Sequence, residues 1–153
     1  MKPQDLNHAE EDKIIQLALK ILSKRYRRGR EVSSPNAVRE YLQLQLVERV
    51  NEVFGALFLD NKHRVLAFEE MFYGIIDGTQ VHPRIVVQQA LQLNAAAVIF
   101  VHNHPSGVAE PSRADEHITQ KLKDALALID IRVLDHIIVT AESTLSLAER
   151  GLM

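Results

Sequence analysis

One short stretch, residues 95–101 with the sequence AAAVIFV, limits the possible folds more than any other part of the chain. It is wholly apolar, and polar residues follow it directly. The run has the length of a strand and is short for a helix. An apolar run without alternation is typical of a strand buried on both faces, which requires a sheet covered on each side. The chain is therefore expected to form a layered α/β domain.

The rest of the chain supplies the elements that such a domain needs. Aromatic and branched residues predict strands at 52–60 and 64–73, and the short connection Asn61-Lys62-His63 joins them as an antiparallel hairpin. Residues 131–140 predict a further strand, and residues 102–112 predict a loop. Apolar residues at three- and four-residue spacing predict helices over residues 9–28, 35–46, 83–93 and 113–128. The order of these elements indicates a mixed sheet flanked by helices.

Specific residues mark several of the predicted helix ends and one turn. Ser33 and Ser34 offer an N-cap before Pro35, which suits the first position of a helix. Gly29 suits the end of the first helix, and Asp77-Gly78 predicts a turn. The first helix is expected to bury one apolar stripe, formed by Ile14, Leu17, Ala18, Ile21 and Leu22.

Composition excludes several classes of site. The chain has 153 residues and a formal charge of −2, which fits one domain and gives no global attraction to nucleic acid or to an anionic membrane. It has no cysteine, so a disulfide scaffold, a cysteine zinc finger, an iron–sulfur cluster and a cysteine nucleophile are excluded. Residues 1–12 are polar and acidic rather than typical of a secretory signal, and no run approaches the ~20 apolar residues of a membrane span, so we expect a cytoplasmic protein.

The chemistry concentrates in residues 102–115, HNHPSGVAEPSRAD. His102 and His104 are two apart, so on an extended chain they point to the same side, and Asp115 falls in the first turn of the next helix. Two imidazoles and one carboxylate leave a fourth position open on zinc, the pattern of a catalytic site. A more ordinary interpretation treats the histidines as hydrogen-bonded polar groups at a strand end, with Ser112 as N-cap and Asp115 as its capping-box partner.

The spacing H-x-H-x7-S-x2-D with an upstream glutamate resembles the JAMM signature of JAB/MPN-domain zinc metalloproteins. The chain resembles the RadC family in particular, over about residues 36–153, through the words LFLD (57–60), VHPR (81–84), HNHPSG (102–107), PSRAD (111–115) and VLDHIIV (133–139). The resemblance implies a single MPN/JAB-like domain at 35–153, with cytidine-deaminase-like layering, and a helical lead-in at 1–34. It also implies a short form without the family's N-terminal helix-hairpin-helix-like module. His63 and Ile85 depart from the usual asparagine and acidic residue of the family.

The resemblance implies a role for each site residue. His102, His104 and Asp115 would bind one zinc ion per chain. Glu52 would take a proton from the water that attacks a peptide or isopeptide carbonyl and return it to the leaving amine, and Ser112 would stabilise the developing oxyanion. Nearby carboxylates are alternatives for the base, namely Glu48, Glu69 and Glu70.

Two further features leave alternatives open. Asp135 or His136 could orient a ligand imidazole, or could have a buried structural role. Basic residues surround Tyr26 at the end of the first predicted helix. Cations are favoured at the C-terminus of a solvent-exposed helix, which is the simpler interpretation, and contact with nucleic acid is the alternative. These cations are Lys24, Arg25, Arg27, Arg28 and Arg30.

The leading functional hypothesis is therefore a zinc metallopeptidase with an unidentified protein or peptide substrate. The alternative is a non-catalytic or DNA-associated binding module on the same scaffold, with a role in DNA repair or in a mobile element. A nucleobase deaminase is excluded, because its zinc site needs a P-C-x-x-C motif and the chain has no cysteine.

Overall fold

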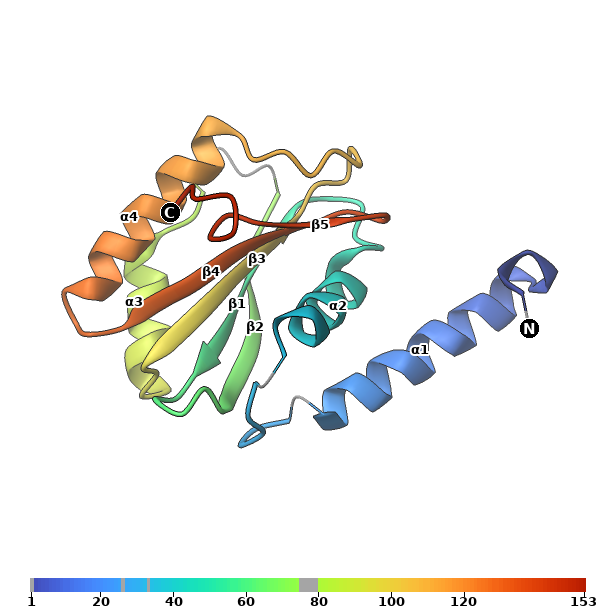
Figure 1. Ribbon diagram of the computed structural model, residues 1–153, viewed down its shortest axis with the longest axis horizontal. Coiled ribbons are helices and arrows are strands. Elements are labelled where there is room, and N and C mark those ends of the chain that lie inside the picture. Colours follow the sequence, from blue (N-terminus) through green and yellow to red (C-terminus); the bar gives the residue numbers. More distant parts are fainter. Residues whose placement is uncertain (1, 26, 33, 75–79) are drawn as a thin grey trace.

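A five-stranded mixed sheet forms the centre of the computed structural model, which describes residues 2–25, 27–32, 34–74 and 80–153 (Figure 1). The strands are β1 (Val53–Leu59), β2 (Val65–Tyr73), β3 (Ala97–Asn103), β4 (Arg132–Val139) and β5 (Thr144–Ser146). They lie in the order β2-β1-β3-β4-β5. Only β3 and β4 run parallel, and the predicted hairpin is the antiparallel pair β1·β2. The expected α/β class with a mixed sheet is confirmed.

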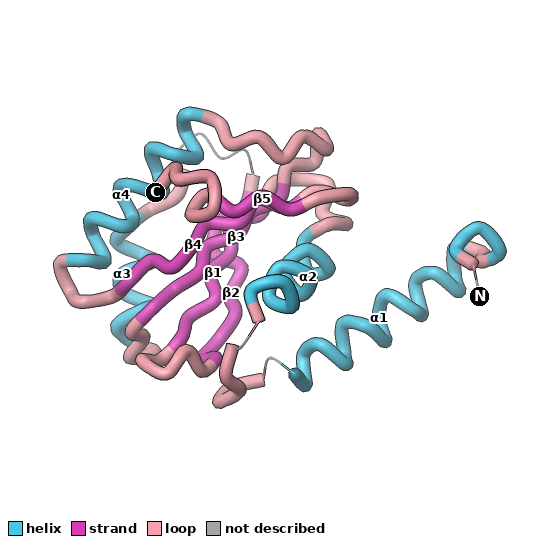
Figure 2. Tube along the Cα trace, viewed as in Figure 1, coloured by secondary structure: helices cyan, strands magenta, loops and turns pink. Residues whose placement is uncertain are grey.

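Helices cover both faces of this sheet, as Figure 2 shows. After a 3-10 turn at Pro3–Asp5, the helices of the chain are α1 (His8–Arg25), α2 (Pro35–Leu46), α3 (Pro83–Gln92) and α4 (Arg113–Ala127). α3 and α4 pack on one face and α2 on the other. Ser34 accepts a hydrogen bond from the backbone of Ala37, which confirms the expected cap of α2. The predictions for Ser33, Tyr26 and the Asp77-Gly78 turn lie outside the described residues.

The side chains of β3 alternate between two separate cores. Val98 and Phe100 belong to the core under α3 and α4, whereas Ile99 and Val101 belong to the core under α2. Every residue of the strand is buried, as the apolar run predicts for residues 97–101. The strand runs two residues further than expected, to Asn103. His102 therefore lies within β3 and not in the following loop.

The expectation that α1 buries an apolar stripe is wrong. Ile14, Leu17 and Ile21 are 42%, 59% and 45% exposed, and no residue of α1 is buried. α2 already covers this side of the sheet, and Figure 1 shows α1 extending away from the rest of the domain. The helix also ends at Arg25, earlier than Gly29 suggested. Amphipathic spacing here indicates a helix without showing what covers it.

Within the described residues, no helix is long and apolar enough to cross a membrane.

Candidate metal centre

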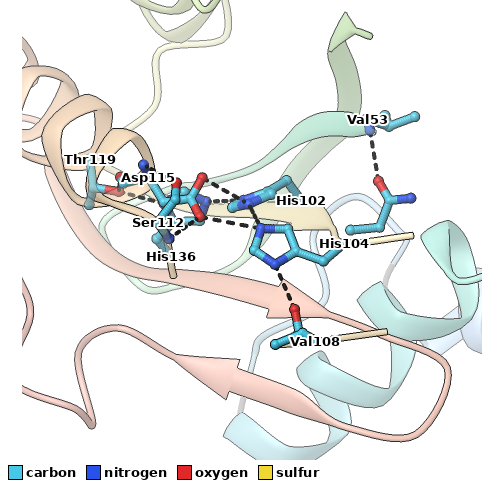
Figure 3. Close-up of polar contacts among 9 residues, drawn as sticks. Val53, His102, His104, Val108, Ser112, Asp115, Thr119 and His136 are labelled. Carbon is cyan, nitrogen blue, oxygen red and sulfur yellow. Dashed lines mark hydrogen bonds and ion pairs between the residues drawn. The ribbon is translucent and has the colours of Figure 1, made fainter. Parts of the chain in front are cut away.

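Three side chains from two elements converge beside the edge of the sheet (Figure 3). His102 lies near the end of β3, His104 follows that strand, and Asp115 lies in the first turn of α4. The Nε2 atoms of the two histidines are 2.8 Å apart. They lie 3.2 and 3.3 Å from the two carboxylate oxygens of Asp115. The side chains of His102 and Asp115 are almost fully buried, and that of His104 is 12% exposed, so the site opens on the His104 side.

Backbone contacts hold these elements in place. The amide of His104 donates to the carbonyl of Val139 at 3.0 Å, which continues the parallel pairing of β3 and β4 beyond the last strand residue. At the start of α4, Ser112 and Asp115 form the predicted capping box. The Ser112 amide donates to Asp115 Oδ2 at 2.8 Å, and Ser112 Oγ accepts from the Asp115 amide at 3.0 Å. The cap thus fixes the carboxylate that faces the histidines.

A backbone carbonyl sets the tautomer of His104. Its Nδ1 lies 2.8 Å from the carbonyl oxygen of Val108, which can only accept. Nδ1 must therefore carry the hydrogen. In the neutral ring, Nε2 then presents a lone pair toward His102 and Asp115.

Electrostatics at the centre favours a negative carboxylate. Burial alone would raise the pKa of Asp115, but the imidazoles of His102 and His104 beside its two oxygens, with the hydrogen bond from the Ser112 amide, hold that pKa far below its usual range. The hydrogen bond that the protonated His104 ring donates to Asp115 raises the pKa of His104, against the effect of burial. Burial lowers the pKa of His136 well below the usual range of a histidine. The centre therefore attracts a cation, whether a proton or a metal.

The donor set fits a metal ion. One suitable atom from each of His102, His104 and Asp115 lies within 4.8 Å of the other two. Ligands of a tetrahedral zinc at 2.0–2.1 Å would be about 3.3 Å apart, close to the separations of 2.8 to 3.3 Å found here. Two imidazole lone pairs that face each other beside a carboxylate repel unless a hydrogen or a metal ion lies between them. Nitrogen and carboxylate donors without thiolate suit zinc or another divalent transition metal.

Glu52 is not one of the three clustered ligands. It immediately precedes β1, whose first amide, that of Val53, donates to the side chain of Asn103 at 2.7 Å. The carbonyl of Glu52 accepts from the amide of Gly74 at 2.9 Å. Its charge contributes to the raised pKa of His104, which places the carboxylate within electrostatic reach of that ring.

The alternative carboxylates have other partners or positions. Glu69 accepts a hydrogen bond from Gln89 at 2.7 Å, and Glu70 forms an ion pair with Arg49. Glu48 is exposed in the segment after α2. These contacts hold Glu69 and Glu70 on partners outside the metal centre.

Asp135 and His136 point to opposite faces of β4. Asp135 accepts a hydrogen bond from the hydroxyl of Ser146 at 2.6 Å and from the amide of Ala148 at 3.1 Å, so it holds β5 and not a ligand. His136 lies 2.7 Å from Nδ1 of His102. Of the two neighbours, His136 is thus the one that contacts the centre.

Two features escaped the sequence reasoning. Thr119 is fully buried and contacts both His136 and the backbone of Asp115. The sequence contained a signal for Thr119, because a threonine one turn after Asp115 on the apolar side of a helix needs a polar partner. β5 has only three residues, too few for a recognisable pattern.

Comparison with known proteins agrees with this geometry. The family described as RadC-like JAB domain matches residues 32–152. Two relatives, each named UPF0758 protein, come from Stutzerimonas stutzeri strain A1501 and Nitrosococcus oceani. The first is 59% identical over 140 residues, or 92% of this chain and 62% of the relative. The second is 65% identical over 127 residues, or 83% of this chain and 57% of the relative. The chain thus spans about three fifths of the length of these curated relatives, and it belongs to the RadC-like JAB domain family.

Proposed function

We propose that this domain is a zinc-dependent hydrolase of the metallopeptidase type, which cleaves a peptide or isopeptide bond. The observation that carries the proposal is the buried convergence of His102, His104 and Asp115, with a separate carboxylate, Glu52, whose charge acts on the His104 ring. The match to the RadC-like JAB family supports it. Zinc bound there would supply a positive charge that polarises a carbonyl and acidifies water.

Glu52 is the proposed general base and acid. A base must reach the attacking water without being occupied as a ligand, and the charge of Glu52 acts on His104, the most exposed of the three clustered side chains. The carboxylate takes a proton from water during attack and donates it to the leaving amine. Anchoring of the Glu52 carbonyl by Gly74 limits movement of this residue.

Ser112 is the proposed oxyanion donor. Its Oγ accepts the hydrogen bond from the Asp115 amide, so the hydrogen of the hydroxyl remains available for a second partner. Ser112 is exposed, although its neighbour Asp115 is buried, so a substrate carbonyl has access to it. A hydrogen bond that strengthens as charge develops on that oxygen lowers the barrier.

Zinc content tests the ligand set directly. We expect the purified chain to bind about one zinc ion, and His104→Ala to lower zinc affinity by more than about 100-fold, because one of three protein ligands is lost. His63→Ala is the matched control, since His63 lies in the β1–β2 connection and should leave affinity unchanged. Calorimetric titration with zinc measures both. Unchanged affinity in His104→Ala would contradict the site.

The second candidate function is a DNA-associated binding module. It is favoured by five exposed cations at the end of α1, Lys24, Arg25, Arg27, Arg28 and Arg30. If it holds, the chain binds a short fluorescent DNA duplex with an affinity that falls steeply as salt rises. Replacing all five cations by alanine should then abolish binding in an anisotropy titration. Equal binding by the replaced chain would refute contact through this cluster.

A further inference from the structure

A series of hydrogen bonds starts at the nitrogen of His102 that faces away from the metal centre (Figure 3). Nδ1 of His102 lies 2.7 Å from Nε2 of His136, and Nδ1 of His136 lies 2.5 Å from Oγ1 of Thr119. Oγ1 of Thr119 in turn donates to the backbone carbonyl of Asp115 at 2.6 Å. The series starts at one proposed ligand and ends on the backbone of another. His136 and Thr119 are both fully buried.

We propose that Thr119 and His136 are positioning residues, which together fix the tautomer of His102 so that its Nε2 lone pair points into the metal centre. This inference rests on the proposed metal site and extends it to two residues that are not ligands. Partners of this kind commonly set the ring orientation and basicity of metal-binding histidines.

The direction of the hydrogen bonds follows from counting hydrogens. The hydroxyl of Thr119 has one hydrogen, and the carbonyl of Asp115 can only accept, so that hydrogen is used there. The hydroxyl oxygen must then accept from His136, whose Nδ1 therefore carries a hydrogen. Thr119 thus imposes one tautomer on the neutral His136 ring.

The same count of hydrogens determines which nitrogen of His102 carries a hydrogen. The His136 ring lies edge-on to Phe54 and Phe100, at centroid distances of 5.4 and 6.3 Å, and its described hydrogen-bond partners are His102 and Thr119 alone. In these apolar surroundings the ring is neutral and carries a single hydrogen. Its Nε2 must accept, so Nδ1 of His102 donates and Nε2 of His102 retains the lone pair.

His104 reaches the same tautomer by a different route. Its Nδ1 donates to the carbonyl of Val108 in the loop, whereas His102 donates to a buried side chain. When both rings are neutral, both Nε2 atoms carry lone pairs on the side of Asp115, as a metal ligand requires. A purely structural role for His136 would be satisfied with the hydrogens in either direction. An experiment must therefore measure the direction of the hydrogen bond between His102 and His136.

The test replaces Thr119 in the full chain and measures zinc binding and histidine tautomers, with no substrate. Thr119→Val keeps the shape but removes the acceptor, so His136 should shift its hydrogen to Nε2 and force a hydrogen onto Nε2 of His102. We expect zinc affinity to fall about 10- to 100-fold. In the metal-free chain, nitrogen-15 NMR should show His102 change from the Nδ1–H to the Nε2–H form. Thr119→Ser should restore both properties.

Thr140→Val is the matched control. Thr140 is also buried, but its hydroxyl bonds Ser143 and not a histidine, so zinc affinity should change less than twofold. Wild-type affinity and tautomer in Thr119→Val would overturn the proposal. So would an Nε2–H form of His102 in the metal-free wild type, which needs no variant to fold. If the wild type binds no zinc, the proposed function fails, while its tautomer still decides the role of Thr119 and His136.

Discussion

Glu52→Gln is expected to retain one zinc ion per chain and to lose turnover by about 10²- to 10⁴-fold, the usual contribution of a general base. The amide has almost the same size as the carboxylate but cannot take a proton from water. Because Glu52 is not among the three ligands, zinc affinity should stay within a few-fold of wild type. The separation of the two effects is the signature of a base.

The activity assay must include substrates with peptide bonds and substrates with isopeptide bonds. A library of fluorescence-quenched peptides, together with a second library linked through the ε-amine of lysine, covers peptide and isopeptide cleavage. The zinc-loaded wild type is first assayed on both, and Glu52→Gln on the best substrate. A variant as active as wild type would eliminate the assigned mechanism.

Glu69→Gln and Glu70→Gln are matched controls, since both carboxylates lie on β2, next to the strand that Glu52 precedes. Glu69 is bonded to Gln89, and Glu70 is paired with Arg49. Each control should retain activity within a few-fold of wild type, with some loss of stability from the broken contact. A loss of turnover in a control alone would move the base to that residue.

The sequence predicted the central elements well because their signals are local. The apolar run before His102 identified a strand buried on both faces, and Ser34 before Pro35 marked the start of α2. The capping box of Ser112 and Asp115 follows from a spacing of three residues. These signals also place the two histidines and the aspartate at one edge of the sheet.

The parts that the sequence missed depend on which face of an element is covered. The stripe of α1 has the right spacing for burial, but α2 occupies the sheet face on that side. Asp135 and His136 are adjacent and equally polar, and only the pleat of β4 decides which of them meets His102. Within that strand, the register against β3 shifts after Val98, so alternation could not be extrapolated from the sequence.

Removal of zinc should weaken the domain without unfolding it. The two cores on either side of the sheet are built from apolar residues such as Leu42 and Phe100, which are fully buried against other apolar side chains. At zinc concentrations about 100-fold above the dissociation constant, binding should stabilise the fold by about 2.7 kcal/mol. For a chain of this size that corresponds to a Tm higher by roughly 5 to 11 °C.

The measurement is thermal unfolding with zinc and with a chelator, monitored by circular dichroism. The chelated chain should still unfold cooperatively, because a catalytic site adds a ligand to a fold that already exists, whereas a structural zinc site supplies the folding energy itself. His104→Ala is the control, and its Tm should not respond to zinc. Loss of secondary structure on chelation would make the metal structural. If zinc raised the Tm of His104→Ala as much as that of the wild type, the stabilising zinc ion would bind elsewhere in the chain.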